Sequence, residues 1–372
     1  MTRQPQRGAS TLLLCSLLLM VLGLAGLWSA RHLGAAQRMA ATDQRAAMAV
    51  QAADAGLAWA SAMLNTGRID NTCRPTFNSG QDLRERALRT DANGHLLPAP
   101  GRPAVATCIN IGAQRWDCRC DGRLPDSSPS PLPSSSPSQS PSPTPAPPRA
   151  PQPSFAIRFT DTDTPGQLSL ISRGCSEPSP ACADPDLPPP DSTGLAEHSQ
   201  HLALLSALRR PPASPLVEGN NAFVRVFGYP SSQYRLQPAL TRLRCGADCG
   251  PELRQAFARG RRLIWIDGSV TLREAPPMPA SQEPVVLLVD GQLNIQTAMD
   301  FSGVLYARSG IHWQPPVGSR SLLRGAVITE GQLIRPAAPT TITLEWDADL
   351  LNRISRQMGS YLPVPGGWST RR

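Results

Sequence analysis

Lysine is absent from the chain, so all 36 basic side chains are arginine, and the formal net charge is +8. A basic complement made only of arginine is typical of genomic codon bias, which makes the positive charge weak evidence for a nucleic-acid partner. The local cluster Arg259, Arg261 and Arg262 is then interpreted as solvated surface. We therefore predict no nucleic-acid partner.

The motifs that carry catalysis or cofactor binding are missing as well. The chain has neither a phosphate-binding Gly-Lys-Ser/Thr motif nor a glycine-rich dinucleotide fingerprint. His198 and His201 form an HxxH pair, but two further metal ligands cannot be identified for them. The histidines are scattered without a nucleophile or base beside them: His32, His95, His198, His201 and His312. The sequence predicts no enzyme, no cofactor and no metal site.

Proline is absent between Pro5 and Pro75, and no charged residue lies between Thr11 and Ala30. An uncharged run of that length, mostly apolar, can cross a bilayer as a helix. Arg3 and Arg7 precede the run, which favours a cytoplasmic amino terminus and an exported remainder. A secretory signal removed near Ala30 or Ala36 is the alternative.

The helical pattern continues beyond the apolar run. Small and apolar residues recur there at spacings of three and four, interrupted only by Asp43. One helix from Ala9 to about Asn65 would be about 85 Å long. The recurring residues are Ala36, Met39, Ala46, Val50, Ala53, Leu57, Ala60 and Leu64. A removable signal would not need this continuation, so we predict a persistent helix.

Two segments of this region resemble the amino-terminal signature of PilX-type minor pilins. They are QRGASTLLLCSLLLMVLGLAGL and QRMAATDQRAAMAVQAADAGL, and the last six letters correspond to the AAEAGL-like motif of that family. The resemblance covers about 60 residues and implies a leader, residues 1–8, that ends at Gly8. It also implies that Ala9 becomes the methylated first residue of the mature chain. The final LPVPGGWSTRR resembles, more weakly, the PGSW-like ending of related proteins.

Leu13 departs from the pattern of major pilins, which carry a glutamate at this fifth mature position. That glutamate can pair with a neighbouring subunit's amino terminus, and an unpaired carboxylate in a bilayer or filament core is costly. A subunit with no neighbour to pair with is better served by leucine. The resemblance therefore implies a minor subunit at the filament tip or at its initiation.

Nine cysteines are present, and Cys15 lies within the apolar run, which leaves eight beyond it. Eight cysteines suit an oxidising compartment and up to four disulfides. Cys118 and Cys120 are too close in sequence to pair comfortably, and Cys73 and Cys108 are candidate partners for them. The remaining candidates bracket two small loops and are interpreted as local disulfides rather than halves of a metal site: Cys175 with Cys182, and Cys245 with Cys249.

The middle of the chain divides by composition into three segments, at 66–123, 124–153 and 154–260. The first contains four cysteines and a predicted strand at 105–111, and the second is a Pro/Ser-rich linker or loop. In the third we predict strands at 155–159 and 167–172 and a short amphipathic helix in EHSQHLALLSALRR. These segments predict a mostly β head.

The carboxy-terminal third, 261–372, repeats a strand, an x-Gly corner and a second strand. The corner glycines recur about every 20 residues, at Gly268, Gly291, Gly310 and Gly331. Such a repeat fits a short β-solenoid, whereas Asp-Gly between strands also fits antiparallel hairpins. We favour the solenoid, closed by a strand at 342–346 and a helix at 348–358.

The sequence thus predicts an α+β protein: a transmembrane pilin helix at 9–65, a mostly β head and a terminal β repeat. The resemblance implies a minor pilin that primes or caps a type IV pilus, single-pass in the inner membrane with a periplasmic head and later part of the extracellular filament. Its expected partners are other major and minor pilins, the prepilin peptidase, the assembly platform and, for an adhesive head, a cell-surface target. A type II secretion pseudopilin and a periplasmic protein with a cleaved signal remain alternatives.

Overall fold

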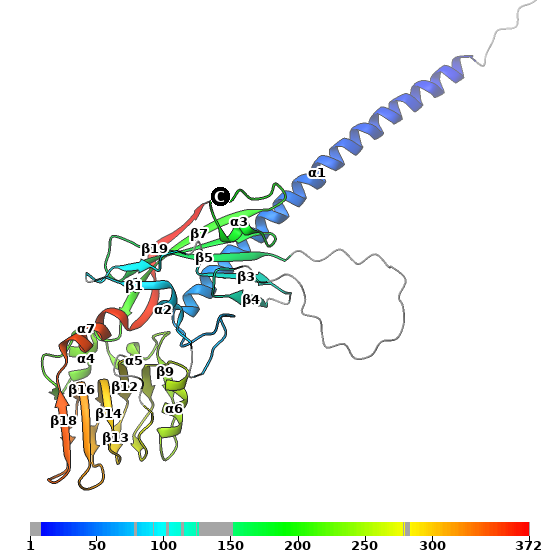
Figure 1. The fold of residues 1–372 in the computed structure, drawn as a ribbon. Coiled ribbons are helices and arrows are strands. Elements are labelled where there is room, and N and C mark those ends of the chain that lie inside the picture. Colours follow the sequence, from blue (N-terminus) through cyan, green and yellow to red (C-terminus); the bar gives the residue numbers. More distant parts are fainter. Residues whose placement is uncertain are drawn as a thin grey trace, which may run out of the picture.

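The computed structural model describes residues 9–77, 80–91, 93–101, 104–112, 115–123, 125, 152–277, 279 and 283–371. The predicted leader, 1–8, and all but three residues of the predicted linker, 124–153, lie outside the described residues. The predicted long helix is confirmed as α1, Ala9–Met63. Its amino-terminal half projects away from the rest of the molecule, and its carboxy-terminal half packs in the head (Figure 1).

The head is one antiparallel sheet laid against the carboxy-terminal half of α1, and it has six strands in the order β19-β7-β6-β5-β3-β4. Leu57, Leu64, Phe155 and Ile157 are among the side chains buried between helix and sheet. Smaller elements border it: α2 (Leu83–Ala87), the hairpin β1 (Leu88–Thr90) with β2 (Leu96–Pro98), and α3 (Pro180–Ala183). The strands are β3 (Ala106–Asn110), β4 (Trp116–Arg119), β5 (Ser154–Thr160), β6 (Gln167–Cys175), β7 (Leu195–Ser206) and β19 (Gly359–Arg371).

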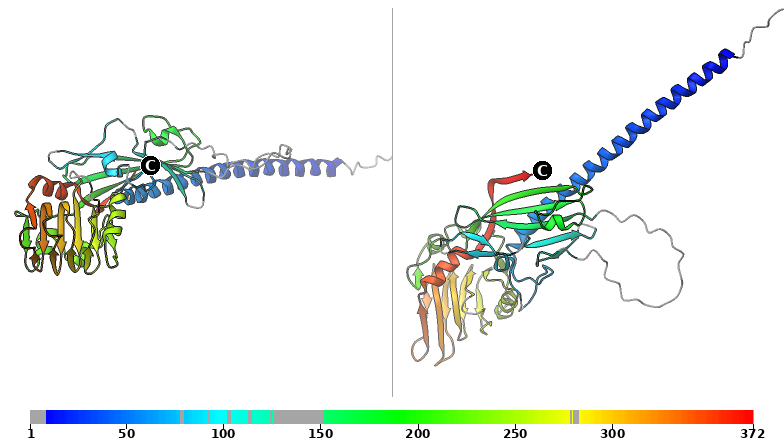
Figure 2. Two further views of the ribbon diagram at one scale, coloured as in Figure 1. Left: turned by 60° about the horizontal axis from the view of Figure 1, so that its bottom comes forward. Right: turned by 45° about the horizontal axis from the view of Figure 1, so that its top comes forward.

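A second unit is inserted between two paired strands of this sheet. The chain leaves the sheet at the end of β7, forms residues 207–358 and returns as β19, which pairs antiparallel with β7. The inserted unit lies at the end of the molecule opposite to the amino-terminal end of α1 (Figures 1 and 2).

The inserted unit is a β-solenoid of about five turns over residues 241–345. Successive coils pair only in parallel, which confirms stacked coils and excludes the hairpin alternative. β8 (Leu216–Glu218) pairs with β16 at the far end. One sheet contains β9 (Thr241–Leu243), β10 (Leu263–Ile266), β12 (Val285–Val289), β14 (Asp300–Ala307), β16 (Arg320–Thr329) and β18 (Thr341–Glu345); the other contains β11 (Val270–Leu272), β13 (Gln292–Ile295), β15 (Gly310–Trp313) and β17 (Leu333–Ile334).

The central strands of the larger solenoid sheet are buried on both faces, which explains their continuous apolar runs such as VVLLV in β12. Its inner face meets the solenoid core, where α6 (Gly250–Ala258) packs beside the first coil. Its outer face is covered by α4 (Ala222–Phe227), α5 (Ser231–Tyr234) and α7 (Ala348–Gln357). We expected the helix at 348–358 to close the end of the stack, but α7 instead covers this face because Leu350, Leu351 and Ile354 are its apolar side chains.

Two further predictions were wrong. The segment predicted as a short amphipathic helix, 197–210, lies in β7 as far as Ser206, because β6 and β19 supply backbone partners on both edges of that strand. The solenoid occupies 241–345 rather than beginning at 261, and residues 359–371 leave the repeat and complete the head sheet as β19. Both differences depend on pairing between segments that are distant in sequence.

Neighbouring coils approach closely at several glycines, and at the two closest approaches the backbone also has a positive φ. Gly303 and Gly325 occupy the same position in neighbouring strands, with φ of 141° and 124°. A Cβ at Gly325 would lie closer than 3 Å to the carbonyl oxygen of Gly303. Both the backbone conformation and the available space therefore require glycine here.

Replacing Gly325 by alanine should destabilise the solenoid by about 2 kcal/mol or more, since the added methyl group forces the coils apart. The measurement is thermal or urea unfolding of the full chain in detergent. Gly246→Ala is the matched control, because no atom lies within 4 Å of its added Cβ. Equal stabilities of the two variants would contradict the prediction.

Candidate functional site: the amino-terminal helix and its docking on the head

The amino-terminal half of α1 is an exposed apolar rod. The most apolar stretch of 18 residues in this helix is not buried by any other part of the described chain. By length and composition the helix can cross a membrane. Residues 12–30 span about 28 Å of helix, close to the ~30 Å hydrocarbon thickness of a bilayer. The exposed side chains include Leu12, Leu13, Leu14, Leu17, Leu19, Met20, Leu22, Leu27 and Trp28. Such a surface requires lipid or other helices around it.

The residues implied by the resemblance lie at the start of this rod. Gly8 is outside the described residues, and Ala9 is the first residue of α1. Leu13 is 67% exposed on the helix surface. The first acidic residue of α1 is Asp43, 30 positions further on, so the projecting apolar part of the helix carries no carboxylate.

The carboxy-terminal half of α1 is held against the sheet by small residues on both sides. Ala49 and Ala53 are fully buried, and a Cβ on Gly174 of β6 would lie closer than 3 Å to backbone atoms of both. A Cβ on Gly56 would lie equally close to Ser172 and Phe155. The backbone of α1 at Ala49 and Ala53 is therefore in near contact with the backbone of β6 at Gly174. Neither Gly56 nor Gly174 leaves room for a side chain larger than a hydrogen atom.

Asp54 adds a polar contact to the same interface. Its carboxylate lies 2.6 Å from Nδ1 of His198 on β7, and Trp368 of β19 packs edge-on against the His198 ring at 5.6 Å. His198 is buried, whereas His201 is exposed three residues later on the strand. The two histidines of the HxxH pair thus face opposite sides of the sheet and do not share a site. The Ala-Ala-Asp-Ala-Gly-Leu segment, noted above for its resemblance, is the docking surface of α1.

The eight cysteines beyond Cys15 form four disulfides in the structure, and Cys15 is free. Cys120 pairs with Cys73 and Cys118 pairs with Cys108, while Cys175–Cys182 and Cys245–Cys249 close short loops. Disulfides persist in oxidising compartments, which indicates an extracytoplasmic head.

One group of potential metal ligands occurs among the described residues. Cys245, Cys249 and Glu252 have ligand atoms within 4.8 Å of one another. The two sulfur atoms are joined in a disulfide, so neither is a thiolate that could bind a metal.

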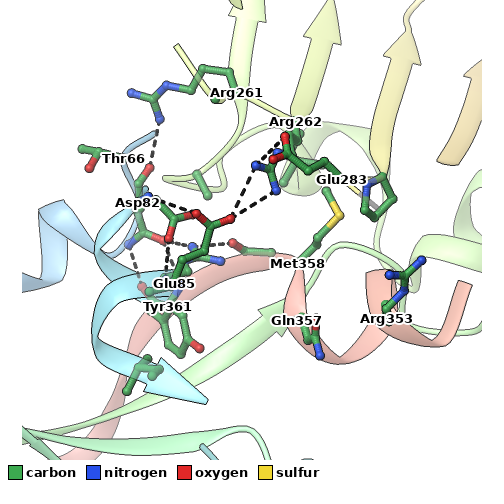
Figure 3. A pocket seen from close by; sticks show the side chains of 18 of the residues that line it. Thr66, Asp82, Glu85, Arg261, Arg262, Glu283, Arg353, Gln357, Met358 and Tyr361 are labelled. Atoms are coloured by element: carbon green, nitrogen blue, oxygen red, sulfur yellow. Dashed lines mark hydrogen bonds and ion pairs between the residues drawn. The ribbon is translucent and has the colours of Figure 1, made fainter. Parts of the chain in front are cut away.

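The head and the solenoid meet at a cavity of about 430 Å³ that is rich in charged side chains (Figure 3). Arg262, directly before β10, lies 2.8 Å from Glu283 and 3.5 Å from Glu85 of α2. Arg68 also pairs with Glu283, at 3.1 Å. Burial, followed by the neighbouring Asp82, raises the pKa of Glu85. The pairs Arg262–Glu85 and Arg68–Glu283 connect the two units, whereas Arg262–Glu283 lies within the inserted unit.

Arg84 and Asn65 lock the end of α1 to the first residues of β19. Arg84 donates to the carbonyl oxygens of Leu64 and of Gly359, the latter at 2.7 Å, and its guanidinium lies 4.7 Å from the centre of the Tyr361 ring. The Asn65 side chain accepts from the Tyr361 amide at 2.9 Å and donates to its carbonyl at 3.0 Å. Burial lowers the pKa of Arg84 and raises the pKa of Tyr361 to about 12.

Sequence reasoning missed this junction. Arg84 and Gly359 are 275 residues apart, and neither lies in a local pattern. The ion pairs and backbone contacts of the junction hold the two units together. The junction contains none of the residues singled out from the sequence as site candidates.

Comparison with known proteins finds no matching family model, no matching curated protein and no matching solved structure. The architecture is that of a long apolar amino-terminal helix followed by a β-rich head, which is compatible with a pilin-like fold. It belongs to a pilin-like or otherwise anchored secreted protein.

Replacing Gly56 by valine should weaken the docking of α1, because the added side chain would overlap Ser172 and the Phe155 ring. We expect a loss of about 2 to 3 kcal/mol in the unfolding free energy of the head and faster protease cleavage near residue 45. Gly34→Val is the control on the same helix, since no atom lies within 4 Å of its Cβ. Equal protease sensitivity in the two variants would argue against a docking role.

The disulfides should differ in their contributions. Cys73–Cys120 spans 47 residues and Cys175–Cys182 spans 7, so loop entropy predicts losses of about 4 and about 2 kcal/mol when each pair is replaced by serine. Urea unfolding of the full chain in detergent, followed by circular dichroism, compares them. A larger loss at the shorter loop would contradict the loop-entropy account.

Proposed function

We propose that the chain is a minor pilin of a type IV pilus, anchored in the inner membrane by α1 before assembly and then held in the filament by the same helix. The head and solenoid would remain outside the packed helices, in the periplasm first and on the extracellular filament afterwards. The observation that carries the proposal is the division of α1 into an exposed apolar half and a half packed on an antiparallel sheet.

The continuous helix supports an assembly role over simple export. A cleaved signal would end near Ala30, whereas α1 continues without a break to Met63 and its last turns form part of the core of the head. A chain cleaved near Ala30 would keep the helix from 31 to about 44, which is mostly exposed and does not pack on the head. A cleaved signal does not account for this remaining stretch of helix.

Leu13 supports a specialised position within the filament. Burying an apolar side chain in a helix bundle is favourable without any partner, whereas a buried carboxylate needs one. A subunit with leucine here does not need a neighbouring subunit to neutralise a carboxylate. We therefore propose that it lies at the filament tip or starts filament assembly. The solenoid, at the far end of the molecule from the membrane, would then be the surface displayed outward.

Mass spectrometry of the mature amino terminus tests the proposal. We expect a chain beginning at methylated Ala9, with prepilin peptidase as the processing enzyme, and we expect a Gly8→Leu variant to retain its leader. Gly23→Leu, in the exposed apolar part of the same helix, should be processed normally, because no atom lies within 4 Å of its Cβ. A mature terminus near Arg31 or Gln37 would rule out the filament role.

A further inference from the structure

Three arginines form a column on the projecting part of α1. Arg31, Arg38 and Arg45 are separated by seven residues each, so they lie on nearly one face of the helix, about 10.5 Å apart. Arg31 and Arg38 are exposed. Arg45, at the edge of the head, is partly buried and donates to the Ser192 carbonyl at 2.6 Å.

The chain itself does not neutralise this column. Neither Arg31 nor Arg38 forms an ion pair with any of the described residues. The nearest acidic residue on α1, Asp43, lies five residues after Arg38 and two before Arg45. Helix neighbours pair at spacings of three or four, so Asp43 faces elsewhere.

Lipid headgroups can account for Arg31 but not for the whole column. Arg31 directly follows the apolar run and lies at the edge of the hydrocarbon layer. The headgroup region adds only about 5 to 8 Å on each side of a bilayer. Arg38 lies about 10 Å beyond Arg31 along an upright helix and Arg45 about 21 Å beyond it, outside that region.

A second copy of this chain does not match the column either. The carboxylates of α1 are Asp43 and Asp54, 11 residues apart, and Asp54 already contacts His198. No stagger of two parallel copies brings both carboxylates opposite arginines spaced by seven. A helix that complements the column therefore belongs to a different polypeptide, because α1 of a second copy lacks the matching carboxylates.

We propose that the Arg31–Arg38–Arg45 column binds a helix of a different filament subunit, one that carries carboxylates at seven-residue spacing. The inference rests on the proposed filament role. When helices surround α1, the guanidinium groups lose water, and burying them without an opposite charge is costly. Acidic residues in register on the neighbouring helix compensate this cost and set the axial position of the subunit.

The absence of lysine from the chain allows a direct test. Arg38→Lys keeps the positive charge and introduces the only lysine side chain, which a carbodiimide can couple to a carboxylate in direct ion-pair contact. Gln37→Lys is the matched control, because the adjacent position is equally exposed but points about 100° away. Filaments are sheared from cells that carry the full chain, treated with carbodiimide and digested, and the coupled peptides are sequenced.

We expect the lysine of the Arg38→Lys variant to couple to an Asp or Glu of a different subunit, and the lysine of the Gln37→Lys variant to give no such product or at least tenfold less. Coupling in Arg38→Lys only to a second copy of this chain, or no coupling to any protein, would overturn the inference. Presence of the unmodified chain in the sheared filament fraction is scored separately. Its absence there would overturn the proposed function, whereas its presence without coupling would overturn the arginine assignment alone.

A matched charge change gives a second readout. Arg38→Gln and Gln37→Glu each make the helix more negative by one charge, but only the first removes a member of the column. The two variants are compared at equal levels in the membrane. We expect Arg38→Gln to lower the amount of the chain in filaments by about tenfold, the effect of losing a desolvated ion pair. We expect Gln37→Glu to leave that amount unchanged. Equal effects of the two variants would indicate net charge rather than a specific contact and would overturn the inference.

Discussion

The near-contact between the backbone of α1 and the antiparallel sheet is the constraint on which the rest of the molecule depends. Ala49, Ala53 and Gly56 face the sheet, where Gly174 leaves no room for a side chain. Larger residues would hold helix and sheet apart and allow sliding, whereas this contact fixes both the distance and the axial position of the helix. It therefore determines where the head ends and how much of α1 projects beyond it.

The solenoid takes its orientation from the same helix through its return strand. It leaves the sheet after β7 and re-enters as β19, so both of its connections lie at one end of two paired strands. Asn65 and Arg84 then bind the first residues of β19 to the end of α1. The ion pairs Arg262–Glu85 and Arg68–Glu283 also cross the junction. A rotation of the solenoid relative to α1 would have to break both sets of contacts.

Those parts of the fold that depend on local sequence could be predicted, and those that depend on distant pairing could not. The absence of proline and charge predicted α1, and the period of Gly268, Gly291, Gly310 and Gly331 predicted the coils. Asp-Gly corners suit hairpins and solenoids alike, so only the parallel register separated the two. The segment 197–210 has apolar residues that fit a helix, and the strand formed by 197–206 follows from pairing with β6 and β19. Pro363 and Pro365 in β19 were a usable signal for an edge strand.

Along α1, three zones with different surface chemistry follow one another from the amino-terminal end to the head. An apolar zone suits lipid, an arginine-bearing zone suits an aqueous or acidic neighbour, and a small-residue zone suits the sheet. Because the helix is continuous, these zones cannot shift relative to one another. In the proposed filament, the arginine zone would exchange water for protein when the apolar zone exchanges lipid for neighbouring helices. Leucine at position 13 would need no charged partner at one end of the projecting helix, whereas the arginines at the other end would need one. The proposed role would therefore place recognition of the subunit in the region just below the head rather than in the membrane core.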